Sequence, residues 1–167
     1  AVDAMVRLVE RLDATGRRIV VLAAPGDRRD EDIANIAAIC AGKFDHYICR
    51  RDDNPRGRAP DEVPRLLREG LVAAGVRPDQ VTAIADEQEA IEAALRMGRT
   101  GDVLLIFVDA IRRGWKEVTG FTPDASLPRE KPRATFVEVP PVPEPVIPEG
   151  ELVRDERGVR LARETDD

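Results

Sequence analysis

Residues 18 to 24, Arg18-Ile19-Val20-Val21-Leu22-Ala23-Ala24, are the most informative segment of the sequence. Apart from Arg18 they are apolar and rich in β-branched residues, with no alternation of polar and apolar positions. This pattern is typical of a strand that is buried on both faces of a sheet. Pro25-Gly26-Asp27 ends the strand, and helical spacing of apolar residues follows. The segment therefore predicts an α/β fold.

Short apolar strands and amphipathic helices alternate on both sides of this segment. We predict helices over residues 1–13, 31–41, 61–74, 86–97 and 112–119, with Asp30, Asp61 and Asp86 as N-caps. Further strands are predicted over residues 45–49, 81–84 and 102–108. Such alternation calls for right-handed crossovers. The predicted fold class is α/β, with a mainly parallel sheet and helices on both faces.

The composition changes after residue 122. Eight of the 13 prolines lie between residues 123 and 148, where we predict extended polyproline II segments. Residues 151–154 and 159–162 flank a turn that contains Gly158, which predicts a β-hairpin. We therefore divide the chain into a body, residues 1–122, and a proline-rich extension, residues 123–167.

Composition excludes several classes of protein. The net charge of -6 argues against a nucleic-acid-binding protein. No apolar run is long enough to cross a membrane, and no secretory signal opens the chain. Cys40 and Cys49 have no metal-ligand spacing, so we expect reduced core thiols, no metal site and a cytoplasmic location. The first residues lie inside a helical pattern without an initiator Met, so we expect an excised piece of a longer protein.

Charged residues follow the first two predicted strands, in the 26–32 segment and the 51–58 segment. If these strands are neighbours, both segments lie at one edge of the sheet, where α/β proteins bind ligands. A third charged loop follows the last strand. Four arginines of the first two segments suit a phosphate or a carboxylate: Arg28, Arg29, Arg56 and Arg58. Three aspartates suit a cationic group: Asp52, Asp53 and Asp109. Each arginine taken singly also fits an exposed surface position.

No complete catalytic device is visible. The dinucleotide-binding G-x-G-x-x-G and the phosphate-binding G-x-x-x-x-G-K-[ST] motifs are both absent. His46 begins a predicted strand, where we expect a structural or exposed role. We expect Trp115 in the core or under a lid. Periodicity and spacing therefore predict a charged site but name no reaction.

Several motifs resemble one family. They are Gly26-Asp27-Arg28-Arg29-Asp30-Glu31-Asp32-Ile33, Phe44-Asp45-His46-Tyr47-Ile48 and Asp53-Asn54-Pro55-Arg56-Gly57-Arg58. At these separations they are similar to the C-terminal domain of the Mur ligase superfamily, over residues 1–122. The D-N-P-R run resembles the peptidoglycan ligases that add diaminopimelate or lysine. The G-D-R-R-D-E-D-I run and the R-G-R after D-N-P resemble the cyanophycin synthetases, as does a last strand without G-K-G-H-E.

The resemblance implies a Rossmann-like domain that closes over ATP and presents an incoming amino acid to an acyl phosphate. ATP and Mg²⁺ would be bound mainly by upstream domains, so the fragment is expected to be inactive alone. Asp27, Arg28 and Arg29 are the candidates on the phosphate side. Candidates for binding the amino acid, with arginine favoured, are Asp52, Asp53, Asn54, Arg56, Arg58 and Asp109. The acceptor would be a poly-aspartate (cyanophycin) chain, and a homo-oligomer is expected.

Two alternatives remain open. The domain could come from a peptidoglycan or polyglutamate ligase of the same superfamily. It could instead be a non-catalytic binding or assembly module that uses its proline-rich extension. An ATP-grasp region upstream would favour a cyanophycin-synthetase-like enzyme over the other ligases.

Overall fold

The computed structural model describes residues 1–123 and, as backbone, residues 152–155 and 158–161. The chain divides into two compact units, Ala1–Pro132 and Arg133–Asp167, and each is described by itself. Among the described residues, no helix is long and apolar enough to cross a membrane.

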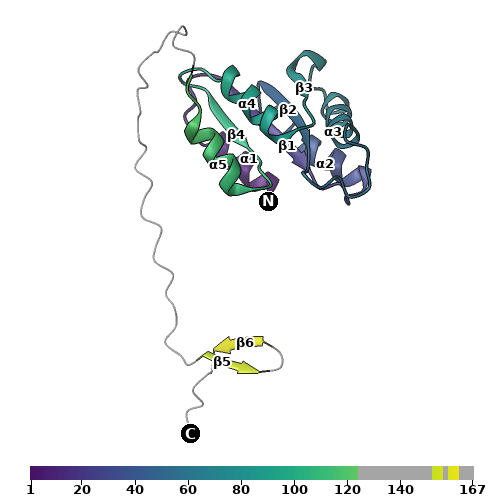
Figure 1. Ribbon diagram of the computed structural model, residues 1–167, viewed down its shortest axis with the longest axis vertical. Coiled ribbons are helices and arrows are strands. Elements are labelled where there is room, and N and C mark those ends of the chain that lie inside the picture. Colours follow the sequence, from purple (N-terminus) through teal and green to yellow (C-terminus); the bar gives the residue numbers. More distant parts are fainter. Residues whose placement is uncertain (124–151, 156–157, 162–167) are drawn as a thin grey trace. The chain divides into compact units, whose positions relative to one another are not determined.

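The first unit is built on a four-stranded parallel sheet with the order β3-β2-β1-β4. Its strands are β1 (Arg18–Ala24), β2 (His46–Arg51), β3 (Val81–Ala83) and β4 (Val103–Ile106) (Figure 1). β1 lies in the interior, between β2 and β4, and most of its residues are buried. Residues 19–24 form an unbroken apolar run because helices cover both faces of this strand.

Helices cover both faces of the sheet, as predicted. One face carries α1 (Val2–Glu10), α2 (Asp30–Cys40) and α3 (Glu62–Ala73), and the other carries α4 (Glu87–Met97). The helix α5 (Ile111–Gly120) packs beside α4, and a short 3₁₀ turn (Pro78–Gln80) precedes β3. Each large aliphatic side chain that these layers bury contributes about 1.5–3 kcal/mol. Those of the larger core include Val20, Leu22, Ile33, Leu67 and Leu71.

Of the predictions for single residues, those for Asp86, Cys40 and Cys49 are confirmed and those for Asp30 and Trp115 are wrong. Asp86 is an N-cap as predicted, and it accepts hydrogen bonds from the N–H groups of Gln88 (2.8 Å) and Glu89 (3.1 Å). The prediction for Asp30 was wrong, because Arg29 holds the N-cap position and Asp30 lies in the first helical turn. The expectation of a packed Trp115 was also wrong, since the side chain is 70% exposed on α5. Cys40 and Cys49 are buried free thiols, as expected.

In the second unit, the strands β5 (Leu152–Asp155) and β6 (Gly158–Leu161) pair in antiparallel fashion. This pairing confirms the expected hairpin. The predicted polyproline segments lie outside the described residues.

Candidate functional site

The 26–32 and 51–58 segments lie side by side at the carboxyl ends of β1 and β2. The two strands are neighbours, with Ala24 opposite Arg51 in the parallel register. At Gly26 the backbones nearly touch, since a Cβ added there would lie 2.2 Å from the carbonyl oxygen of Pro55. Glycine is therefore required at this position by close approach of the neighbouring backbone. The expected shared edge is confirmed.

Arg58 ties the two segments together. Its Nε donates to the carbonyl oxygen of Gly26 (2.8 Å), and its Nη2 donates to the carbonyl oxygen of Arg28 (2.6 Å). The same guanidinium forms ion pairs with Asp30 and with Glu62 at the start of α3. With its side chain 17% exposed, Arg58 has its donors directed at the protein. In this arrangement it holds the shape of the site.

Arg56 bridges the segments a second time, through an ion pair with Asp27. Its backbone has a φ of 49°, a left-handed conformation that is uncommon outside glycine. The N–H of Arg56 donates to Oδ1 of Asn54 (3.0 Å), an Asx turn that supports this conformation. Gly57 follows with a φ of 90°. The segment is thus held in one shape by its own side chains.

The two arginines predicted to contact phosphate, Arg28 and Arg29, differ in whether they form an ion pair with another described residue. Arg29 pairs with Asp32 in the first turn of α2 (Nε to Oδ2, 3.1 Å); the Arg29 side chain is largely exposed and that of Asp32 is half-buried. Hydrogen bonding by Arg29 lowers the pKa of Asp32. Arg28 is exposed, and its guanidinium has no ion-pair partner in the described part of the chain. Arg28 therefore presents a cation to solvent next to the N-terminus of α2.

An ion network with a buried centre joins Asp53 of the 51–58 segment to residues of β2, α4 and α5; this buried ion network consists of Arg50, Asp53, Glu87, Asp109 and Arg113. At its centre is Arg50, the fifth residue of β2, whose side chain is fully buried. It binds both carboxylate oxygens of Asp109 at 3.0 Å and lies 2.8 Å from Oε2 of Glu87. It also donates to two backbone carbonyl oxygens, those of Phe107 (2.8 Å) and Arg51 (2.7 Å). A buried cation is tolerated because so many acceptors surround it.

Glu87 at the start of α4 and Arg113 of α5 extend the network on the face of the sheet that α4 covers. Glu87 is 3% exposed at the first position of α4, and its Oε2 accepts from the N–H of Asp109 (2.7 Å). Arg113 of α5 binds Glu87 and also Oδ2 of Asp53 (2.6 Å). These hydrogen bonds, above all the one that Arg113 donates to Glu87, raise the pKa of Arg113. Asp53 also donates its N–H to Oδ2 of Asp109 (2.8 Å).

The carboxyl groups of Asp52 and Asp109 have pKa values that are shifted in opposite directions. Burial raises the pKa of Asp52, and hydrogen bonding to Asp109 with its negative charge raises it further. Burial alone would also raise the pKa of Asp109, but the hydrogen bonds from Arg50 and from the N–H of Asp53 outweigh it, so this pKa is lowered. The same low-dielectric corner therefore favours ionised Asp109 and disfavours ionised Asp52.

Sequence reasoning placed Asp53 and Asp109 in the site but missed Arg50 and Glu87. Arg50 follows Ile48 by two residues and therefore shares its face of β2, but the strand was expected to end at residue 49. Its neighbour across the register is Ala23, whose small side chain leaves space on that face. Glu87 has the pattern of an ordinary acidic residue in a first helical turn. Only the crossing of β1 by the Arg50 side chain brings these distant residues together.

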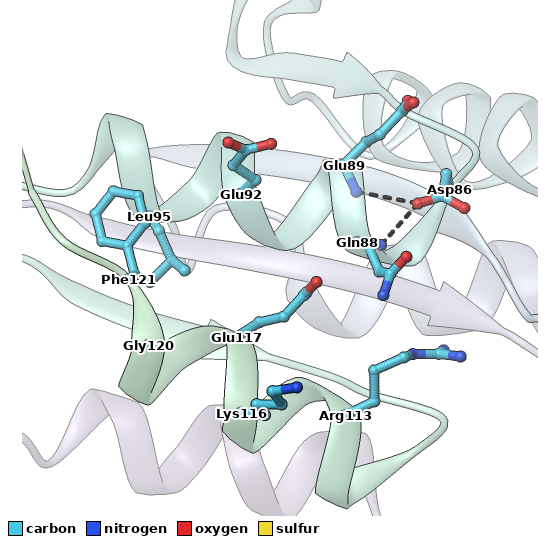
Figure 2. Close-up of a pocket in the computed structure, with 10 residues that line it drawn as sticks. All are labelled: Asp86, Gln88, Glu89, Glu92, Leu95, Arg113, Lys116, Glu117, Gly120 and Phe121. Atoms are coloured by element: carbon cyan, nitrogen blue, oxygen red, sulfur yellow. Dashed lines mark hydrogen bonds between the residues drawn. The ribbon is translucent and has the colours of Figure 1, made fainter.

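A pocket with a volume of about 690 Å³ lies between α4 and α5. Figure 2 shows side chains of both helices around it. Its lining mixes acidic, basic and apolar residues: Asp86, Gln88, Glu89, Glu92, Leu95, Arg113, Lys116, Glu117, Gly120 and Phe121. Arg113 thus belongs to both this pocket and the buried ion network. Among the described residues, no group of three or more His, Cys, Asp or Glu side chains could hold a metal ion.

Comparison with known proteins agrees with this architecture. Residues 1–107 match the family model "Mur ligase, glutamate ligase domain". The cyanophycin synthetase of Crocosphaera subtropica is 39% identical over 98 residues, which are 59% of this chain and 11% of that protein. That of Trichormus variabilis is 31% identical over 127 residues, 74% of this chain and 14% of that protein.

A diaminopimelate ligase is also similar. The UDP-N-acetylmuramoyl-L-alanyl-D-glutamate--2,6-diaminopimelate ligase of Rhizobium meliloti is 37% identical over 106 residues, 62% of this chain and 20% of that protein. The chain spans a tenth to a fifth of the length of these relatives. Because the matching family model covers residues 1–107 of 167, the chain belongs to the Mur ligase family and contains its glutamate ligase domain.

Proposed function

We propose that this chain is the amino-acid-presenting domain of an ATP-dependent, ADP-forming amide ligase of the cyanophycin synthetase type. In this proposal the 51–58 segment holds the incoming amino acid, arginine, while its amino group attacks an acyl phosphate. The acyl phosphate forms on a side-chain carboxylate of a poly-aspartate chain. Upstream domains of the same protein supply most of the ATP and Mg²⁺ binding, in a cytoplasmic homo-oligomer.

The observation that carries the proposal is the double tie between the 26–32 and 51–58 segments. Arg56 pairs with Asp27, and Arg58 binds two carbonyl oxygens of the neighbouring segment. An amine must approach an acyl phosphate in line, and small errors of position are costly in such reactions. Two polar segments locked to each other at the ends of buried strands supply that rigidity. The names of the relatives reported above support the reaction class.

The proposed roles follow the contacts. Arg28 and Arg29 would approach the phosphate groups, where they would neutralise negative charge, with Asp27 held beside them. Arg28 fits this role because it is exposed and has no ion-pair partner among the described residues. Mg²⁺ would supply charge neutralisation at the phosphates, but the described residues offer it no cluster of ligands. Its binding is therefore assigned to the upstream domains.

On the amino-acid side, Asn54 and Arg56 would bind the carboxylate of the substrate. A guanidinium group would meet the acidic Asp52 and Asp53, with Asp109 behind them. Asp53 and Asp109 already bind Arg113 and Arg50 respectively. Arg58 acts in this proposal by holding the two segments, because its own donors are all directed at the protein.

The decisive test is Arg56→Ala in the whole ligase, with Arg77→Ala as a control. Arg77 is an exposed arginine paired with Asp79, away from the 51–58 segment. We expect Arg56→Ala to raise the KM for the amino acid about tenfold or more and to leave the KM for ATP nearly unchanged. A larger effect on ATP would refute the proposed role of the segment.

A second candidate is a ligase for a different amino acid, which the D-N-P-R run and the diaminopimelate ligase of Rhizobium meliloti favour. Rates of ADP release with arginine, lysine, meso-diaminopimelate and glutamate as sole amino acids would separate the two. The 167-residue chain alone should hydrolyse no ATP. Turnover by this chain would contradict the proposed division between domains.

A further inference from the structure

Asp53 is held at both its backbone and its side chain by residues outside its own segment. Its N–H donates to Oδ2 of Asp109 (2.8 Å), and its carboxylate accepts from Arg113 (2.6 Å). The next residues in the chain are Asn54, Pro55 and Arg56, which the proposed function assigns to the amino acid. The position of Asp53 therefore sets where that part of the segment begins.

Both holders of Asp53 depend on two buried residues. Asp109 is fixed by the two hydrogen bonds from Arg50, and its N–H is bound by Glu87. Arg113 is fixed by Glu87. Neither buried side chain touches solvent, with exposures of 0% for Arg50 and 1% for Glu87. A ligand in the site would touch Asn54 or Arg56. Arg50 and Glu87 would act on it only through the network.

Stability gives no reason for charges at these two positions. Burying a guanidinium and a carboxylate costs several kcal/mol per ion, and apolar residues of similar volume often fold as well or better. The network even leaves Nε of Arg50 without a hydrogen-bond partner among the described residues. An apolar pair could not, however, fix the orientation of the Asp109 and Arg113 side chains. Directional hydrogen bonds are what the buried charges add.

We infer that Arg50 and Glu87 are positioning residues, which set the 51–58 segment for the incoming amino acid through Asp109 and Arg113. This inference rests on the proposed function, because it assigns the positioned segment to the amino acid. It adds two residues on β2 and α4 that are remote from the surface of the site.

Glu87→Gln is the sharpest test. Glu87 faces donors on every side: Arg50, Arg113 and the N–H of Asp109. A glutamine keeps the shape but turns an NH₂ toward one of these donors, so that contact is lost. Glu87→Asp retains the charge, so it should be less impaired than Glu87→Gln. The matched control is Glu92→Gln on the same helix, whose partner is the exposed Arg96.

In the whole ligase, Glu87→Gln should raise the KM for the amino acid about tenfold, with the KM for ATP changed less than about twofold. Hydrogen exchange of the Asp53 amide should accelerate in the same variant, and Glu92→Gln should change neither quantity. A fall in maximal rate that matches the folded fraction, with both KM values unchanged, would mean that the network is merely structural. That result would overturn the inference.

Two further variants serve if Glu87→Gln does not fold and distinguish this inference from the proposed function. If Glu87→Gln does not fold, Arg113→Gln replaces it, since Arg113 is 35% exposed and its loss still frees the Asp53 carboxylate. Arg56→Ala separates the two proposals. A raised amino-acid KM in Arg56→Ala but not in the network variants would refute the positioning role and leave the proposed function intact. If Arg56→Ala has no effect on this KM, the proposed function itself fails.

Discussion

Replacing Arg50 by methionine tests the energetic role of the buried ion network. Methionine fills much of the same volume but has no donors. Removing one partner of a buried ion pair costs about 3–5 kcal/mol, because the remaining charge is left without compensation. In this network Glu87 would keep Arg113 and the N–H of Asp109, so the unpaired charge would be that of Asp109. The side chain of Asp109 is 24% exposed and can be partly hydrated. We therefore expect the lower end of the range, about 3 kcal/mol.

Urea unfolding followed by far-UV circular dichroism would measure this loss of stability. Fluorescence of Trp115 is a poor signal, since that side chain is 70% exposed and reports little of the core. Arg65→Met is the control, because Arg65 forms an exposed pair with Glu69 on α3. Its free energy of unfolding should change by less than about 0.5 kcal/mol.

The pH dependence of the Arg50→Met effect gives an independent check. The folded protein lowers the pKa of Asp109 below 3.8, so this group stabilises the fold above that pH and loses its contribution as the pH falls further. The cost of Arg50→Met should therefore be full near pH 7 and should shrink below about pH 4. A cost under about 1 kcal/mol at neutral pH, or one that is independent of pH, would refute the reasoning.

Three further predictions concern other parts of the body. Burial raises the pKa of both Cys40 and Cys49 to about 12, so neither thiol should react with a disulfide reagent at about pH 8 until the chain is unfolded by urea. Burial and then the neighbouring Asp109 raise the pKa of Asp52 above 3.8, so its ionisation destabilises the fold as the pH rises. Asp52→Asn should accordingly raise the melting temperature near pH 7, and that gain should vanish below about pH 3.8, where the unfolded group is also protonated. Gly26→Ala should cost about 1–3 kcal/mol in urea unfolding, because its Cβ would meet a backbone carbonyl oxygen; an unchanged midpoint would mean that the two segments are not in contact.

The pattern of apolar residues was sufficient to predict the sheet and its helices. Residues 19–22 are fully buried on both faces of the sheet, so each of these positions must be apolar, and the sequence shows this as an apolar run without alternation. Asp86 has the local signature of a cap, and its hydrogen bonds lie within one turn of the chain. Features of this kind depend on neighbours in sequence, so the sequence is enough to find them. The edge shared by the 26–32 and 51–58 segments followed from the assumption that β1 and β2 pair.

The buried ion network could not be predicted in this way. Arg50 lies in the sequence where the apolar run 47–49 gives way to charged residues, and its burial follows from a side chain that reaches past Ala23 to Asp109, 59 residues away. Trp115 failed in the opposite sense, since an aromatic residue on an amphipathic helix was expected inside and lies outside. A residue pattern reports which local structure is stable. Which polar groups meet in the interior is set by strand order and crossovers, because these bring together residues that are far apart in the chain.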